Sequence, residues 1–439
     1  MSEDKATTKT AKSRKSLTTA RSGWQFIQDD FREGHEHKKA GKPVVWSCAL
    51  IEKEIYYALG IHPYYPEQFA SLCAIRRKTP ESDNDAIRFS RIAEQAGYST
   101  DLCGYQRTAM GYVLNGDLSD APLGGMAAPD LLITSSKVCD LRVKWWEDMA
   151  QRLNVPMFTI DKPERFFEGM LREPRPHEIR YYRSQLEDCI AFISEVTGQA
   201  YDPGRLNECL DLSYKTNELR LEIMQLCKAV PSPMSAADGF ATMYPGMYCS
   251  GTEKAYQFYR TLRDELRERV ETGRGQIENE RFRLLILGMP LWFNMGLLNY
   301  FEPIGGAFAY QANYNATPWP SRNPDEPLLE IATRTLTEGT SLIRMMVTGT
   351  EELVREYQID GVLISSIITC RPVYIPMLET RHMLETKLGV PSVQIECDLV
   401  DERSFSWGQV RTRLDAFAEQ ILHRKGLSEY PGSGKDAEK

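Results

Sequence analysis

The chain has 439 residues, of which 42% are hydrophobic and 26% charged, with a formal net charge of −8. This composition indicates a globular protein of two to three units, at roughly 150 residues per unit. Acidic and basic residues are mixed without a long basic stripe, which disfavours nucleic acid as a partner, and the lack of a run of about 18 apolar residues predicts no membrane span.

The first 40 residues are predicted to form a flexible tail and a leading helix. Met1–Arg21 is rich in Lys, Thr and Ser and lacks an apolar stretch, so we expect a disordered tail and not a secretion signal. Acidic Glu3 and Asp4 argue against a mitochondrial presequence. A cytoplasmic location is therefore expected. Residues 426–439 are predicted to form a second flexible tail.

The first α/β domain is predicted over residues 41–175. A strand opens it at Pro43–Trp46, and the helix expected over Glu52–Leu59 ends at Gly60, a residue that often terminates helices. Further along, Cys103 precedes a helical pattern. A thiolate at the N-terminus of a helix is favoured by the helix dipole, which suits metal ligation.

The most informative feature of the chain is an internal repeat. Residues 129–161 and 360–396 share one order: an apolar strand, a cysteine, a helical stretch, and a Val-Pro pair that opens another apolar strand. The two cysteines are Cys139 and Cys370. Short apolar runs that alternate with helices predict βαβ units, and parallel sheets bind their ligands beyond the carboxyl ends of the strands. Both cysteines are therefore expected at a ligand-binding edge.

Between the repeats, residues 176–278 are predicted to form a helical linking region, because apolar residues recur at three- and four-residue spacing in His177–Thr197, Asp202–Ala229 and Thr252–Thr272. The second α/β domain is predicted over residues 279–425. Its first strands are expected at Arg283–Gly288 and Gly306–Tyr310, followed by a loop over Asn313–Pro327. The predicted fold class is α/β, with two Rossmann- or flavodoxin-like domains of parallel strands joined by a helical segment.

The chain has ten cysteines and no CxxC pair. In a large chain without an export signal, reduced thiols or metal ligation are better expectations than disulfides. Taken singly, Cys103, Cys139 and Cys370 each fit an inert buried thiol. Together they suggest a site in the cleft between the two domains, where soft thiolates would suit an iron–sulfur cluster or zinc. The others are expected to pack in the core (Cys48, Cys73, Cys397) or along helices (Cys189, Cys209, Cys227), and Cys249 is left open.

The motifs around the three candidate cysteines resemble the 2-hydroxyacyl-CoA dehydratase and benzoyl-CoA reductase family. They are the Cys103 motif, Cys139 with Lys144-Trp145-Trp146, and Ser-Ile-x-x-Cys370. The segments Glu54–Gly60 and Gly408–Phe417 fit the same family, so the resemblance covers about residues 43–425. Within the family, Pro231–Pro233, Tyr256–Arg263 and Arg283–Leu285 are most similar to the cluster-bearing subunit, of the B type, of ATP-dependent benzoyl-CoA reductases.

This resemblance implies one [4Fe-4S] cluster on Cys103, Cys139 and Cys370, with one cluster corner open. It also implies a related cluster-bearing subunit, and two ATPase activator subunits that carry a further [4Fe-4S] cluster and pass on electrons from reduced ferredoxin. The implied reaction reduces the ring of an aromatic acyl-CoA to a cyclic diene through a ketyl radical at the thioester. The chain itself has no Walker A loop and no dinucleotide fingerprint, so another subunit would handle ATP.

Three alternatives stay open. The first is a subunit of a 2-hydroxyacyl-CoA dehydratase, which is a lyase and returns its electron after each cycle. The second is a non-catalytic electron-transfer homodimer of the double-cubane type. The third is an α/β binding protein with buried free thiols.

Seven further residues carry expectations. From the resemblance, Glu54 lies near the substrate pocket and could assist proton transfer, or could equally be an ordinary helix glutamate. Trp292 and Phe293 could form the wall of an aromatic pocket or belong to the core. Trp145 and Trp146, beside Cys139, could shield the cluster from water. His35 and His37 are expected in a solvated loop.

Overall fold

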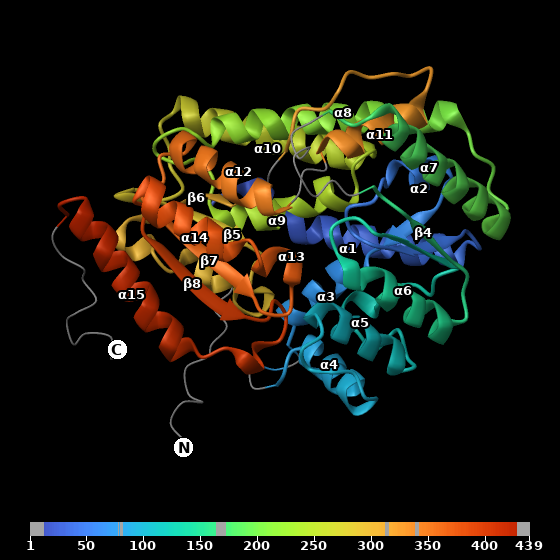
Figure 1. The fold of residues 1–439 in the computed structure, drawn as a ribbon, viewed down its shortest axis with the longest axis horizontal. Coiled ribbons are helices and arrows are strands. Elements are labelled where there is room, and N and C mark those ends of the chain that lie inside the picture. The colour runs from blue at the N-terminus through green and yellow to red at the C-terminus, as the bar shows by residue number, and fades with distance from the viewer. Residues whose placement is uncertain are drawn as a thin grey trace.

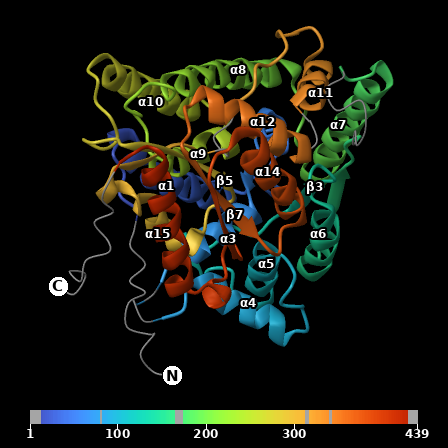
Figure 2. The same cartoon turned by 60° about the vertical axis from the view of Figure 1, so that its left-hand side comes forward.

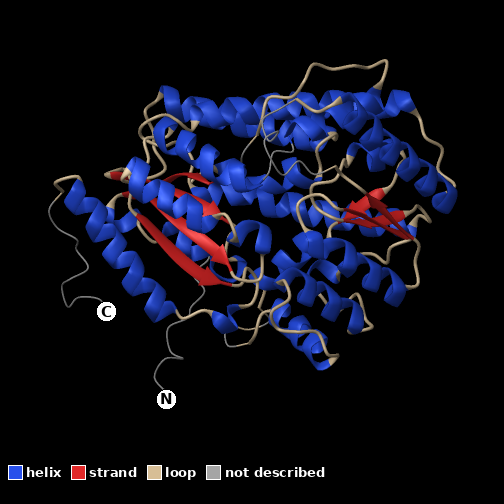
Figure 3. Cartoon of the chain, in the orientation of Figure 1, coloured by secondary structure: helices blue, strands red, loops and turns tan. Residues whose placement is uncertain are grey.

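The computed structural model describes residues 13–77, 79, 82–163, 173–311, 316–338 and 342–427. The described residues form two separate four-stranded sheets, and every strand pairing is parallel. Figure 3 shows the two sheets apart, with helices around and between them. The first sheet consists of β1 (Val44–Ser47), β2 (His62–Tyr64), β3 (Leu131–Ser135) and β4 (Met157–Ile160). The second consists of β5 (Phe282–Gly288), β6 (Gly306–Gln311), β7 (Gly361–Ile367) and β8 (Ser392–Cys397).

The two sheets have the same topology, which confirms the predicted α/β fold class. Their strand orders are β2-β1-β3-β4 and β6-β5-β7-β8, so the first and third strands of each unit are neighbours at its centre. In such an order the chain switches direction between these two strands, and the crevice beyond their carboxyl ends is the usual ligand site. Cys139 and Cys370 follow β3 and β7, the third strand of each unit. The repeat seen in the sequence is therefore structural.

Continuous apolar runs explain why these segments form parallel strands. Every residue of β1, β3, β5, β6 and β7 is buried, as expected of strands covered by helices on both faces. The helices of the first unit are α2 (Glu54–Ala58), α3 (Pro66–Ile75), α4 (Asp85–Gln95), α5 (Gly104–Leu114) and α6 (Asp140–Leu153). Those of the second are α11 (Pro327–Glu338), α12 (Leu342–Glu356), α13 (Arg371–Tyr374), α14 (Met377–Met383) and α15 (Trp407–Arg424).

Four helices connect the two units: α7 (Pro176–Thr197), α8 (Pro203–Leu226), α9 (Ala236–Tyr248) and α10 (Glu253–Glu271). In Figure 1, α8 and α10 run along the top of the molecule, over both sheets. N-cap residues mark the starts of α8 and α10, because the side chains of Asp202 and Thr252 accept hydrogen bonds from backbone N–H groups in the first turns of these helices. The sequence did not predict α9. It is buried on nearly all sides, so it lacks the periodic polar face that marks the other three.

The N-terminal helix α1 (Thr18–Lys39) corrects the expectation of a disordered tail up to Arg21 and the expectation of a loop at His35 and His37. Residues 16–21 are not a disordered tail: the N–H groups of Ser16 and Leu17 bond to Asp238 at 2.8 and 3.1 Å, and those of Thr18 and Thr19 bond to Glu265 at 2.7 and 2.9 Å. Carboxylates from distant helices thus satisfy the free N–H groups of this helix start. Residues 1–12 and 428–439, within the two predicted tails, lie outside the described residues.

His35 and His37 lie on α1 and not in a solvated loop. The His35 ring nitrogen Nε2 lies 3.0 Å from the carbonyl oxygen of Gly125, and the His37 ring packs 6.1 Å from that of His62. Both rings therefore face the first unit, because α1 packs against β1 and β2.

The two units meet directly near the carboxyl ends of their strands. The 3-10 segment η2 (Trp292–Asn299), which follows β5, packs on α3 of the first unit. In the turned view of Figure 2, the second sheet faces α3 and α5 of the first unit. No helix of the described part of the chain is long and apolar enough to cross a membrane.

Candidate metal centre

Each of the three candidate cysteines occupies the N-cap of a helix. Cys103 precedes α5, Cys139 precedes α6, and Cys370 precedes α13. All three side chains are partly exposed, whereas six of the other seven cysteines are buried and Cys209 is partly exposed. All ten are free thiols. The N-cap position places the sulfurs of Cys103 and Cys139 at the positive ends of the α5 and α6 dipoles, which favours the thiolate that a metal requires, whereas α13 after Cys370 is only four residues long.

An ion pair joins the helix starts that carry Cys139 and Cys370. The first residues of α6 and α13, Asp140 and Arg371, contact each other at 2.5 Å between Oδ2 and Nη2. Both side chains are about two-thirds exposed, at 65% and 66%, so the pair contributes little to stability. The pair is informative about geometry, since it joins the residues that directly follow Cys139 and Cys370 across the interface of the units.

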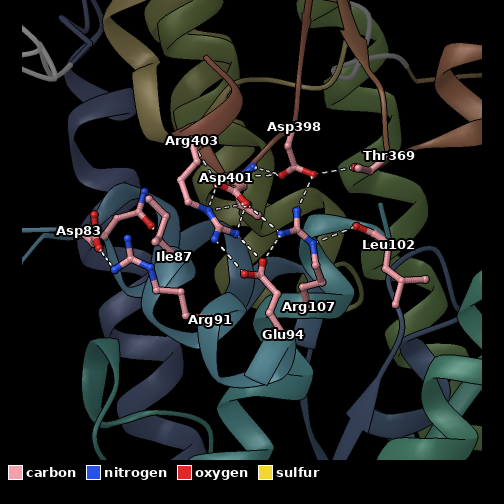
Figure 4. A network of polar contacts seen from close by, with 12 residues as sticks. Asp83, Ile87, Arg91, Glu94, Leu102, Arg107, Thr369, Asp398, Asp401 and Arg403 are labelled. Atoms are coloured by element: carbon pink, nitrogen blue, oxygen red, sulfur yellow. Dashed lines mark hydrogen bonds and ion pairs between the residues drawn. The ribbon is translucent and has the colours of Figure 1, made fainter. Parts of the chain in front are cut away.

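Asp398, which follows β8, links the helix start at Cys103 to that at Cys370. Its Oδ2 accepts hydrogen bonds from Thr369, next to Cys370, at 2.6 Å and from Arg107 of α5 at 3.4 Å. A Cβ atom on Gly104, next to Cys103, would lie 2.1 Å from the Asp398 Oδ1, so only glycine fits there. Figure 4 shows this carboxylate between the two segments.

The thiols influence one another electrostatically, which places them in one neighbourhood. Burial raises the pKa of the Cys103 thiol, and the charges of Cys370, Asp398 and Cys139 raise it further. Burial raises the pKa of Cys370 to about 11; Cys139 adds to this, and the Val373 N–H and Arg142 oppose it. The Val373 N–H itself donates to the Cys370 carbonyl at 3.2 Å. Three thiolates so close repel each other, so a positive metal group would be needed to keep them ionised together.

The donor set fits an iron–sulfur cluster by its chemistry, because thiolate sulfur is a soft ligand that suits such clusters, as it also suits zinc. Among the residues the structure describes, no three His, Cys, Asp or Glu side chains lie close enough to hold one metal ion. A zinc ion needs its thiolates at about 2.3 Å from one point. A [4Fe-4S] cluster instead takes each thiolate on a separate iron atom.

A buried pair of charges beside Cys139 was not predicted. Arg142, on the first turn of α6, donates from Nε to Glu67 Oε1 at 2.9 Å and from Nη1 to the Lys137 carbonyl at 2.8 Å. The other Glu67 oxygen accepts from the Ala49 N–H at 2.7 Å. Arg142 thus brings a fixed positive charge to the thiols. Its place three residues after Cys139 was the one signal in the sequence.

The interdomain clamp is a set of charged residues on α4, α5, the loop between α3 and α4, and the segment after β8. The Arg107 guanidinium, whose side chain is 2% exposed, bonds Glu94 and Asp401 at 2.9 Å each. Arg403 bridges Glu94 and Asp401 from the other side, as Figure 4 shows. The clamp comprises Arg77, Glu94, Arg107, Asp398, Asp401, Glu402 and Arg403. It holds the units together next to Cys103 and Cys370.

Trp292 lies beside the candidate centre, and Phe293 points elsewhere. The Trp292 indole N–H donates to the Tyr105 hydroxyl at 2.6 Å, and Tyr105 is two residues after Cys103. The Phe293 ring is buried against Phe405, with centroids 5.3 Å apart. Of the two predicted pocket residues, the structure brings Trp292 toward the candidate ligands. A role for either in binding an aromatic ring stays a prediction.

Glu54 lies in a buried ion pair between the two units. Its Oε1 is 3.0 Å from Nη1 of Arg334 on α11. Burial by itself would raise the pKa of Glu54, but the charges of Arg334 and Lys53 lower it to about 2. Glu54 is therefore a carboxylate at neutral pH. The role of Glu54 in proton transfer stays a prediction.

The remaining candidates are mainly packing residues. Trp145 and Trp146 are buried in the core of the first unit, with ring centroids 4.3 Å apart, and a shielding role stays a prediction. Cys48, Cys73 and Cys397 are buried, as predicted. Cys249, left open by the sequence, is buried, and its Sγ donates to Asp30 at 3.7 Å.

Comparisons with known proteins agree over nearly the whole chain. The family model described as "2-hydroxyglutaryl-CoA dehydratase, D-component" matches residues 48–421. The (R)-2-hydroxyisocaproyl-CoA dehydratase alpha subunit of Clostridioides difficile is 25% identical, covering 92% of this chain and 96% of that protein. The (R)-phenyllactyl-CoA dehydratase alpha subunit of Clostridium sporogenes is 27% identical, with coverages of 89% and 92%. The B-type subunit of benzoyl-CoA reductase from Thauera aromatica is 29% identical, with coverages of 76% and 79%.

Proposed function

Because the chain belongs to the HGD-D family, described as 2-hydroxyglutaryl-CoA dehydratase D-component, we propose that it is the iron–sulfur subunit of an enzyme that transfers electrons to an acyl-CoA thioester. Of the reactions in this class, we propose the reduction of an aromatic, benzoyl-CoA-type substrate to a cyclic diene. The observation that carries the proposal is a set of three N-cap cysteines near the interface of the units, two of which follow the third strands of the equivalent sheets.

In this proposal Cys103, Cys139 and Cys370 hold one [4Fe-4S] cluster, which supplies low-potential electrons. The dipoles of α5 and α6 and the charge of the buried Arg142 would oppose the rise in thiol pKa that burial causes, while the nearby Asp398 carboxylate adds negative charge that favours a low potential. The Tyr105 hydroxyl accepts from Trp292 and from Ser71, at 2.6 and 3.0 Å, and orders the indole ring beside Cys103.

The proposal includes partners. A related cluster-bearing subunit would complete the catalytic unit, and two ATPase activator subunits with a further [4Fe-4S] cluster would deliver electrons from reduced ferredoxin in the cytoplasm. Large apolar side chains are exposed close to the candidate cysteines: Val138, Ile368, Tyr374, Ile375 and Leu378. An apolar surface of this kind is typical of a contact with another protein.

A second candidate is the dehydratase reaction of a 2-hydroxyacyl-CoA. It is favoured by the wider coverage of the dehydratase alpha subunits, at 92% and 89% of this chain against 76% for the reductase relative. The candidate centre is compatible with either reaction, since both begin with one electron.

Electron stoichiometry separates the two reactions. The complex of this chain with its partner and activator subunits would receive reduced ferredoxin, ATP and either benzoyl-CoA or a 2-hydroxyacyl-CoA. We expect about two electrons consumed per benzoyl-CoA converted, since a net reduction needs an electron pair. Conversion of the 2-hydroxyacyl-CoA with only a priming electron would replace the proposed reductase by the dehydratase. Conversion of neither substrate by a cluster-loaded complex would contradict both.

A further inference from the structure

The residue before Cys139 has an unusual backbone. Val138 has a φ of +74°, a region that β-branched residues rarely adopt. The Cys139 N–H bonds to the Lys137 carbonyl two residues earlier, at 2.9 Å. Together these features define the γ-turn of positive φ, the rarer and strained of the two γ-turn forms. The strain is thus located directly before a candidate ligand.

The equivalent position in the second unit has no such strain. The Cys370 N–H bonds to the Ile367 carbonyl three residues earlier, at 2.9 Å, and the residues between them have ordinary φ values. Both cysteines follow the third strand of the same topology and cap a helix. The shared topology therefore does not by itself require the strain, which is particular to the turn before Cys139.

Several contacts hold the strained turn in place. The Lys137 carbonyl accepts two hydrogen bonds, one from the Cys139 N–H at 2.9 Å and one from the Arg142 Nη1 at 2.8 Å. The Lys137 N–H donates to Ser135 Oγ at 3.1 Å. Arg142 is held in turn by Glu67, because its Nε donates a hydrogen bond to Glu67 Oε1 at 2.9 Å. Strained residues persist where their surroundings over-determine them, and they concentrate at functional sites.

We infer that Val138 is a positioning residue, whose strained γ-turn sets the Sγ of Cys139 toward Cys103 and Cys370. The inference rests on the proposed cluster site. A glycine at this position would relieve the strain and give the Cys139 backbone alternative conformations. An alanine would keep the constraint on φ while removing most of the side chain.

The test compares Val138→Gly, Val138→Ala and Gln358→Gly in the full chain. Gln358, with a φ of +52°, is an exposed residue before β7 and provides a glycine control away from the cysteines. We expect cluster iron to pass to a chelator about tenfold faster in Val138→Gly than in wild type, as for other losses of a supporting contact. Its EPR spectrum should also change. The Val138→Ala and Gln358→Gly variants should match wild type in both readouts.

Two results would overturn the inference. One is an unchanged iron-loss rate and spectrum in Val138→Gly, and the other is equal effects in Val138→Gly and Val138→Ala, which would assign the effect to the side chain. The metal-free chain gives an independent readout. There, Val138→Gly should change the rate at which iodoacetamide alkylates Cys139 relative to Cys370, measured by mass spectrometry in one sample. An unchanged ratio contradicts the inference even if the chain binds no cluster.

Discussion

Replacing Arg107 by Met is expected to lower the free energy of unfolding by about 3–5 kcal/mol, because it removes one partner of a buried charge network. The Arg107 side chain is 2% exposed and contacts Asp398, Asp401 and Glu94. Without it, Asp398 loses the ion pair that ties it to the rest of the clamp. Urea unfolding of the metal-free chain would measure the change.

A matched control is Arg183→Met, since that arginine is 39% exposed and pairs with Glu187 and Glu326 at the surface. This substitution should lower the free energy of unfolding by no more than about 1 kcal/mol. Equal stabilities of the Arg107 and Arg183 variants would show that the interdomain clamp does not contribute as described.

The same clamp gives a pH signature. Burial would raise the pKa of Asp401, but hydrogen bonds from Arg403 and Arg107 lower it to about 2. A carboxyl whose folded pKa is depressed adds stability above its unfolded pKa of about 3.9, and this stability is lost as the pH falls through the folded pKa. Wild type should therefore lose more stability than Arg107→Met as the pH falls from about 4 to about 2.

Replacing Glu54 by Gln is the second change with a large expected effect. It leaves the buried Arg334 guanidinium, whose side chain is 6% exposed, without its carboxylate, at a cost of about 3–5 kcal/mol. The double variant Glu54→Gln/Arg334→Met should recover part of this loss, because the buried Arg334 charge is removed together with its carboxylate partner. Thermal and urea unfolding of wild type, Glu54→Gln, Arg334→Met and the double variant would complete a double-mutant cycle.

The surface variant Glu187→Gln is the control for this pair, since Glu187 is 47% exposed. A Glu54→Gln protein as stable as that control would contradict the account of Glu54 as a structural carboxylate. It would return Glu54 to the group of possible proton-transfer residues.

The sequence was sufficient to predict the two parallel sheets and the repeated strand–cysteine–helix unit. Those features arise from local patterns, namely apolar runs for β3 and β7 and helical periods after Cys139 and Cys370. The N-cap position of Cys103 was predictable for the same reason. Strand–helix periodicity also gave the order of the elements, because each unit is built from contiguous segments.

The contacts that assemble the site could not be predicted. The Arg107–Asp401 and Arg334–Glu54 pairs join residues 294 and 280 positions apart, and no local pattern reveals such partners. Asp398 did carry a signal, since it follows the end of β8 at the same edge as the cysteines. The start of α1 was missed for a related reason: its polar residues resemble a tail, and its capping carboxylates, Asp238 and Glu265, lie more than 200 positions away.

The central claim is that Cys103, Cys139 and Cys370 hold one cluster, and iron and acid-labile sulfide content with EPR tests it most directly. The samples are anaerobically purified wild type, each cysteine-to-serine variant, and Cys189→Ser as a control with a buried, distant thiol. We predict about four irons and four sulfides per wild-type chain, retention in Cys189→Ser, and loss in each of the three variants. A wild type without iron even beside its partner chain, or iron kept after all three substitutions together, would contradict the claim.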